Sequence, residues 1–232
     1  MTAATLPALK TDLAEVLAEL ERAPAAGDGP RFALPANLFH LAKARDRNAR
    51  RGIRRLIRPE NAAPLVDALP AGPEDRTHCV LRGDFVLCDL IPAIIRKHGP
   101  LGHVRIATLG LSTANAQSLA ALVTAGRIAQ LTLVVSHYFQ QVDRTTTYRE
   151  VAGELARIGA RLAVTRNHAK ILLLPFAVAP GFLTARAPLV IEGSANLRSS
   201  DNLEQIAIFA DPELHDFHAA WIDQLAEASP HA

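Results

Sequence analysis

Residues 166–174 read Arg166-Asn167-His168-Ala169-Lys170-Ile171-Leu172-Leu173-Leu174, a polar segment followed at once by an apolar one. Four consecutive large apolar residues bounded by a polar loop are typical of a buried β-strand. Because side chains alternate along an extended chain, His168 and Lys170 should point to the same side. The stretch therefore predicts an imidazole and an ammonium next to each other at a strand end.

Two later segments also place polar residues at the ends of apolar runs. Glu192-Gly193-Ser194-Ala195-Asn196 closes one run, and Asn202-Leu203-Glu204 opens the next. Ser194 and Asn196 share a face by alternation, and the glycine at 193 lets a chain or ligand approach the backbone closely. Together with His168 and Lys170, these segments can supply a nucleophile, a cation, two neutral donors and a carboxylate to one phosphate-sized site.

The surrounding sequence alternates between β-rich runs and helical patterns. Strands are predicted at residues 78–81, 104–109, 131–136, 161–164, 170–174, 189–192 and 205–209, and helices at 85–98, 114–129, 146–158 and 212–225. Strands separated by helices of this length imply βαβ crossovers. The prediction is an α/β fold with a mixed, largely parallel β-sheet and helices on both faces.

The three polar segments resemble the phospholipase D superfamily, also called the HKD family. H-x-K, then G-S-x-N closing a strand, then N-x-E entering another, is the pattern of that family, and the resemblance covers residues 78–225. It implies a phospholipase D-like half-unit. The residues that it assigns are His168 as nucleophile, Lys170 as phosphate-binding lysine, Ser194 and Asn196 as the polar pair, and Glu204 as the acid that holds the histidine.

The resemblance also implies an assembly and a mechanism. Family members that act as monomers carry two such motifs, whereas this sequence carries one, which implies a homodimer whose two copies build one site. One His168 would attack phosphorus while the partner's His168 protonates the leaving oxygen. Water would then hydrolyse the phosphohistidine, and the scheme uses no metal and no other cofactor.

The sequence departs from the family pattern in two places. The family's H-x-K-x-x-x-x-D would place Asp at 175, where this chain has Pro175. That Asp is usually a supporting group, so its loss weakens the case for catalysis without removing the site. Residues 176–188 are read as an inserted loop.

Residues 1–75 are predicted to be a helical N-terminal region, preceding the α/β domain at 76–232. Apolar residues at helical spacing indicate a first helix near residues 6–20, and a second is predicted from about Leu38 to Ile57. Pro59, Pro64, Pro70 and Pro73 then mark the boundary.

The second helix is strongly basic. Residues 43–58 hold eight basic residues and one acid, whereas the whole chain has a net charge of only +2. We expect one side of this helix to bind nucleic acid, DNA rather than RNA, through Lys43, Arg47, Arg50, Arg51, Arg54 and Arg58. A solvated charged face and an anionic membrane surface are the alternatives.

Composition places the chain among globular proteins, with 49% hydrophobic residues. Cys79 and Cys88 lack redox or zinc spacing and are expected to be reduced and partly buried. Residues 1–21 do not resemble a signal peptide, so we expect a cytoplasmic protein without stable membrane association.

Several further residues have two readings. His137 and Tyr138 would line the substrate entrance or cap a helix, and Arg198 would touch a phosphate or form a surface ion pair. His215 and His218 are expected at the surface of the last helix.

The function that these observations favour is metal-independent phosphodiester hydrolysis or transfer on nucleic acid by a homodimer. The alternative is a catalytically inactive phospholipase D-like protein that binds nucleic acid or serves in assembly, for which Pro175 is the chief argument. A lipid phosphodiesterase ranks third.

Overall fold

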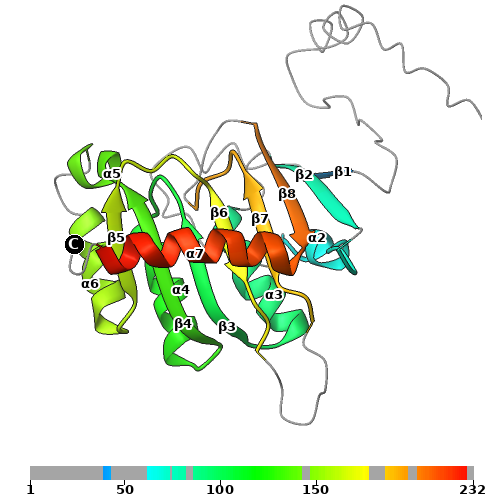
Figure 1. Cartoon of the computed structure of the whole chain (residues 1–232), viewed down its shortest axis with the longest axis horizontal. Helices are drawn as coiled ribbons and strands as arrows, with labels where there is room; N and C mark the ends of the chain where they lie inside the picture. The colour runs from blue at the N-terminus through cyan, green and yellow to red at the C-terminus, as the bar shows by residue number, and fades with distance from the viewer. Residues whose placement is uncertain are drawn as a thin grey trace, which may run out of the picture. The chain divides into compact units, whose positions relative to one another are not determined.

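The computed structural model describes residues 39–42 by their backbone, and residues 62–73, 75–81, 86–142, 147–177, 186–197 and 203–228. These residues form an eight-stranded sheet in the order β1-β2-β8-β7-β6-β3-β4-β5 (Figure 1). The strands are β1 Phe39–Ala42, β2 Arg76–Leu81, β3 Leu101–Ala107, β4 Ile128–Ser136, β5 Arg161–Thr165, β6 Ile171–Leu174, β7 Leu189–Gly193 and β8 Glu204–Ala210. All seven predicted strands are present.

The sheet is mixed, as predicted, but less of it is parallel than predicted. Pairs β1/β2, β3/β4 and β4/β5 are parallel, whereas β2/β8, β8/β7, β7/β6 and β6/β3 are antiparallel. A parallel neighbour needs a long crossover, usually a helix, and helices connect β3 to β4 and β4 to β5. Residues 175–188 and 194–203 join β6 to β7 and β7 to β8, and these strands pair antiparallel.

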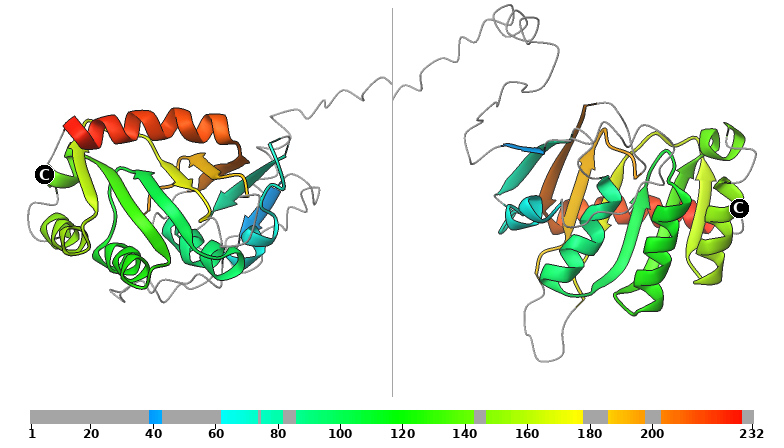
Figure 2. Two further views of the ribbon diagram at one scale, coloured as in Figure 1. Left: turned by 60° about the horizontal axis from the view of Figure 1, so that its bottom comes forward. Right: turned by 180° about the vertical axis from the view of Figure 1, so that it is seen from behind.

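Helices cover both faces of the sheet, as predicted (Figure 2). α7 (Pro212–Ala228) lies on one face, and α3 (Leu90–His98), α4 (Thr113–Thr124) and α6 (Thr147–Arg157) lie on the other. α2 (Ala63–Asp67), the 3₁₀ turn η2 (Leu87–Asp89) and α5 (His137–Val142) are shorter. Successive strand residues enter opposite layers of the core, so Leu172 packs on the α3 side and Leu173 on the α7 side.

Two helix predictions need correction. The helix predicted at 114–129 ends at Thr124, because Gly126 turns the chain with a φ of 65° and β4 begins at Ile128. The helix predicted from Leu38 begins instead as strand β1, which pairs in parallel with β2 and forms one edge of the sheet. Residues 43–61, including the basic cluster, lie outside the described residues.

The start of the α/β domain also differs from the predicted residue 76. β1 belongs to the sheet, and Leu65 and Val66 of α2 are buried in the same hydrophobic core as the residues of β2 and α3. Residues 39–42 and 62–73 are therefore part of the same domain, within the compact unit Pro35–Ala232. The proline-rich stretch contains a short helix with Pro64 in its first turn, a position where proline is well tolerated.

His215 and His218 are buried, which corrects their predicted surface placement. Each is 8% exposed, because this face of α7 lies against the sheet. Trp221 Nε1 donates to His218 Nδ1 at 3.0 Å, and His218 Nε2 lies 2.5 Å from a carboxylate oxygen of Glu192 on β7. Since an indole N–H can only donate, Nδ1 accepts and Nε2 carries the proton that Glu192 accepts. The contact anchors α7 to the end of β7.

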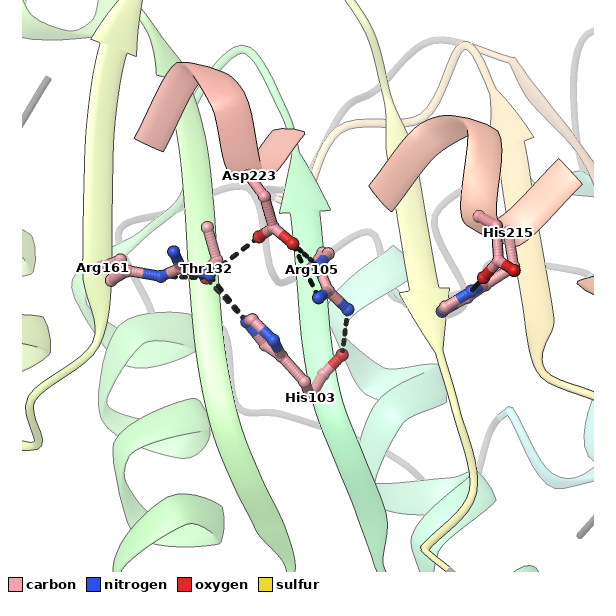
Figure 3. A network of polar contacts seen from close by, with 7 residues as sticks. His103, Arg105, Thr132, Arg161, His215 and Asp223 are labelled. Carbon is pink, nitrogen blue, oxygen red and sulfur yellow. Dashed lines mark hydrogen bonds and ion pairs between the residues drawn. The ribbon is translucent and has the colours of Figure 1, made fainter. Parts of the chain in front are cut away.

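A second polar network fastens α7 to β3, β4 and β5 (Figure 3). Asp223 accepts from Arg105 at 2.7 and 2.9 Å and from Arg161 at 2.8 Å, and the fully buried Thr132 contacts both Arg161 and His103. Burial and the charge of Arg105 lower the pKa of His103 to about 4, so its ring is neutral at neutral pH. Arg105 and Arg161 likewise lower the pKa of Asp223 against the opposing effect of burial. The network stabilises the charged carboxylate between two guanidinium groups.

Cys79 and Cys88 are both buried, at 2% and 1% exposure, so the predicted burial is confirmed. Within the part of the chain that the structure describes, no helix combines the length and apolar character needed to cross a bilayer.

Candidate active site

The three motifs meet where the ends of four neighbouring strands, β3, β6, β7 and β8, lie side by side. This side of the sheet is called here the motif edge. Strand register brings the start of β6 beside the ends of β3 and β7, through the pairs Ala107↔Ile171 and Ile171↔Glu192. The end of β7 in turn lies beside the start of β8, where Gly193 pairs with Ile206. Figure 1 shows β6 and β8 starting at the edge where β7 ends. All five predicted catalytic residues therefore lie at the motif edge.

His168 and Lys170 are adjacent but differ in exposure. His168 is exposed, whereas Lys170 is only 9% exposed. Lys170 Nζ donates to the His168 carbonyl at 2.8 Å and lies 3.1 and 3.2 Å from the two ring nitrogens. Burial lowers the pKa of Lys170, and the negative charge of Glu204 opposes that shift. The predicted imidazole–ammonium pair is thus present, with the ring facing solvent and the amine beneath it.

Asn167 fixes the loop that carries this pair, and the sequence reading did not assign it a role. Its Nδ2 donates to the carbonyls of Thr108 and Val134 at 3.0 and 3.1 Å, and its Oδ1 accepts from the Ala169 backbone at 2.8 Å. One side chain therefore ties the residues flanking His168 to the ends of β3 and β4. A side-chain bond to a backbone two residues on is typical of Asn in a turn, which is the only signal that the sequence offered.

Ser194 and Glu204 contact each other across β7 and β8. The Ser194 hydroxyl donates to the Glu204 carboxylate and accepts from the Gln205 backbone at 3.0 Å. The carboxylate thus bonds a neighbouring hydroxyl in this structure and acts on Lys170 through its charge. The pairing of Glu204 with the His168 ring stays a prediction.

Asn196 is tied to the end of β3 through its side-chain oxygen. Its Oδ1 accepts from the Leu109 backbone at 3.1 Å and lies 3.5 Å from the Thr108 hydroxyl. The following loop is held as well, because Asn115 of α4 donates to the Leu197 carbonyl. Its amide nitrogen makes no hydrogen bond with any residue that the structure describes, so its N–H groups can donate to an anion.

Gly193 has the close backbone approach that the sequence predicted. A Cβ at this position would stand 2.1 Å from the carbonyl oxygen of Gln205 and 2.8 Å from Ile206 Cα on β8. Gly193 also bonds the Lys170 carbonyl at 3.3 Å. Glycine at this position therefore lets β7 and β8 lie close together, which brings Ser194 beside Glu204.

Pro175 lies at the opposite end of β6 from the motif edge. Its carbonyl accepts from Gly102 at the start of β3. Pro175 lies five positions after Lys170 along extended chain, a span of about 16 Å. The residue that departs from the family pattern is therefore remote from the five motif residues in this chain.

The other sequence candidates fall into two groups. His137 and Tyr138 are exposed and directly follow β4, whose end is tied to the His168 loop through Asn167. Ser136 caps the Tyr138 backbone at 3.1 Å, so both earlier readings of this turn remain open. Arg198, the centre of the 176–188 loop and all the residues proposed to bind nucleic acid lie outside the described residues.

No protein-family model and no curated protein matches the sequence, whereas solved structures do. Polyphosphate kinase from Porphyromonas gingivalis aligns with 72% of this chain at 11% identity and a TM-score of 0.49, and the chain spans 25% of that protein. Nuc, a phospholipase D family member from Salmonella typhimurium, aligns over 67% of this chain and 97% of its own at 15% identity and a TM-score of 0.46. NucT from Helicobacter pylori aligns over 67% and 98% at 13% identity and a TM-score of 0.43. Sequence identity to these three solved structures is 11 to 15%.

Proposed function

We propose that this chain is a metal-independent phosphodiesterase of the phospholipase D type that acts on nucleic acid. The observation that supports this most is the convergence of H-x-K, G-S-x-N and N-x-E from three strands on the motif edge. A motif that had arisen by chance would have no reason to bring its five polar residues together in space.

The chemistry follows from the residue types. A phosphodiester is anionic and repels nucleophiles, so its site needs positive charge and donors around the non-bridging oxygens. Lys170 supplies the charge from a largely buried position, where electrostatic interactions are stronger than in water. Asn196 supplies neutral N–H donors, and the exposed His168 ring is open to attack phosphorus.

The proposed activity should survive removal of divalent metal ions. The purified wild-type chain should cleave an activated diester such as bis(4-nitrophenyl) phosphate in excess EDTA, because His168 and Lys170 provide the nucleophile and the charge. Release of nitrophenolate measures the rate. If the chain binds nucleic acid but cleaves neither this diester nor any nucleic acid in EDTA, the catalytic proposal is wrong. The alternative of a non-catalytic nucleic-acid-binding protein then holds.

We also propose that the active form is a homodimer. One motif edge provides a single His168, whereas the mechanism needs a nucleophile and a proton donor. Light scattering should therefore give twice the chain mass of 24.9 kDa. A stable monomer that retains EDTA-resistant hydrolysis would contradict the dimer.

Nucleic acid is the proposed substrate because of the basic cluster in residues 43–58. Replacing Arg47, Arg50 and Arg54 together by Gln should weaken binding to all sequences alike, since phosphate contacts carry no sequence information. Each lost contact should reduce the slope of log K against log salt by about 0.7 to 0.9. An unchanged slope in fluorescence anisotropy titrations would identify this segment as a solvated charged surface.

The alternative, a catalytically inactive phospholipase D-like protein, is supported by Pro175, because the family pattern has Asp at that position. Its position at the far end of β6 leaves the five motif residues unchanged, which favours the enzyme. Whether catalysis survives is decided by the EDTA assay.

A further inference from the structure

The end of β3 contacts both catalytic loops of the proposed site. The Thr108 carbonyl accepts from Asn167, which precedes His168, at 3.0 Å. The Thr108 hydroxyl lies 3.5 Å from Asn196 Oδ1 and accepts from the Leu197 backbone at 3.4 Å. One residue thus joins the H-x-K loop to the G-S-x-N loop.

Thr108 is buried and held in one position by its backbone. It is 1% exposed, and its backbone N–H bonds the Val134 carbonyl at 3.0 Å, the same carbonyl that accepts from Asn167. Its hydroxyl also lies 3.2 Å from the Gly110 carbonyl. A hydroxyl has one proton and two lone pairs, so it can donate to a neighbouring oxygen while accepting from Leu197.

We propose that Thr108 is a positioning residue that sets the separation between His168 and Asn196. This inference rests on the proposed function, in which those two residues act on the same phosphate group. Thr108 is 1% exposed, and it bonds the H-x-K loop through its backbone carbonyl and the G-S-x-N loop through its hydroxyl. Its role is therefore to hold the nucleophile and the donor in register. Misplacement of reacting groups by about 1 Å can cost 10²-fold in rate.

The test removes the hydroxyl at nearly constant volume. Thr108→Val should lower kcat for bis(4-nitrophenyl) phosphate in EDTA by about tenfold to a hundredfold, whereas Thr108→Ser, which keeps the hydroxyl, should restore most of it. The affinity for inorganic phosphate, measured by calorimetry, should fall about tenfold in Thr108→Val, by the same misalignment of donors. Circular dichroism and thermal melts establish that each variant is folded at the assay temperature.

Thr132→Val is the matched control. Thr132 is a fully buried threonine of the same sheet whose hydroxyl also makes hydrogen bonds, but in the network that anchors α7. Its loss should lower the melting temperature and leave kcat and phosphate affinity within about twofold of wild type. Equal losses of kcat and phosphate affinity in Thr108→Val and Thr132→Val would overturn the inference, as would wild-type values in folded Thr108→Val.

Two further cases are covered, a Thr108→Val chain that does not fold and a wild type that shows no turnover. If Thr108→Val does not fold, Asn167→Ala removes the bond to the same residue from the other loop and is held to the same expectations. If the wild type cleaves neither the diester nor any nucleic acid in EDTA, the proposed function fails, and phosphate affinity alone then decides whether Thr108 positions the site.

Discussion

His168→Ala should abolish EDTA-resistant cleavage, with a loss of at least about 10³-fold in kcat, because the His168 ring is the nucleophile of the proposed mechanism. The fold should persist, since His168 is exposed at the entrance to β6 and its ring contacts Lys170 among the residues that the structure describes. Turnover of the diester and the thermal melt are measured on the same sample.

The control for this variant is His78→Ala. His78 lies on β2, paired with Ala207 of β8, and plays no part in the proposed chemistry. It should retain wild-type turnover. If His168→Ala and His78→Ala had equal activity, His168 would not be the nucleophile.

Gly193→Ala should produce the largest loss of stability among single methyl additions at the motif edge, about 3 kcal/mol. The added Cβ would stand 2.1 Å from the backbone oxygen of Gln205, and backbone in a paired strand cannot move aside as a flexible side chain can. Since Gly193 also bonds the Lys170 carbonyl, and Ser194 bonds Gln205, the displacement should reduce turnover too. Urea denaturation at constant temperature measures the change.

Gly153→Ala provides the comparison. Gly153 lies in α6 with open space around the position of a Cβ, so alanine should raise stability by about 0.5 to 1 kcal/mol through helix propensity. A Gly193→Ala protein as stable as wild type would mean that β7 and β8 are not packed as described.

Local patterns explain why most of the fold was predictable. Apolar runs such as Ile171–Leu174 fill positions buried on both faces, and amphipathic segments such as Thr147–Arg157 leave one polar side. Whether neighbouring strands pair parallel or antiparallel was harder to predict, because it depends on whether the connection between them contains a helix. Strand β1 was missed because residues 39–42 pair with residues 78–81 of β2, a contact between segments distant in sequence that overrides local helical spacing.

The motif residues were predictable because alternation and strand-end placement are local properties. His168 with Lys170, and Ser194 with Asn196, needed only the two-residue period of a strand. The residues that support them could not be predicted. Thr108, Asn115 and Asn167 make hydrogen bonds to residues 33 to 89 positions away in the sequence. The burial of His218 was equally hidden, because its partner Glu192 lies on another element 26 residues earlier.

The central claim is that His168 attacks phosphorus, and trapping the covalent intermediate tests it most directly. The wild-type chain is mixed with a ³²P-labelled diester in excess EDTA, quenched in alkaline denaturant, where phosphohistidine survives, and digested for mass spectrometry. The account predicts label on the peptide containing His168 and none in the His168→Ala chain. Turnover of the diester with label on another residue, or with no trapped label under conditions that preserve phosphohistidine, would contradict it.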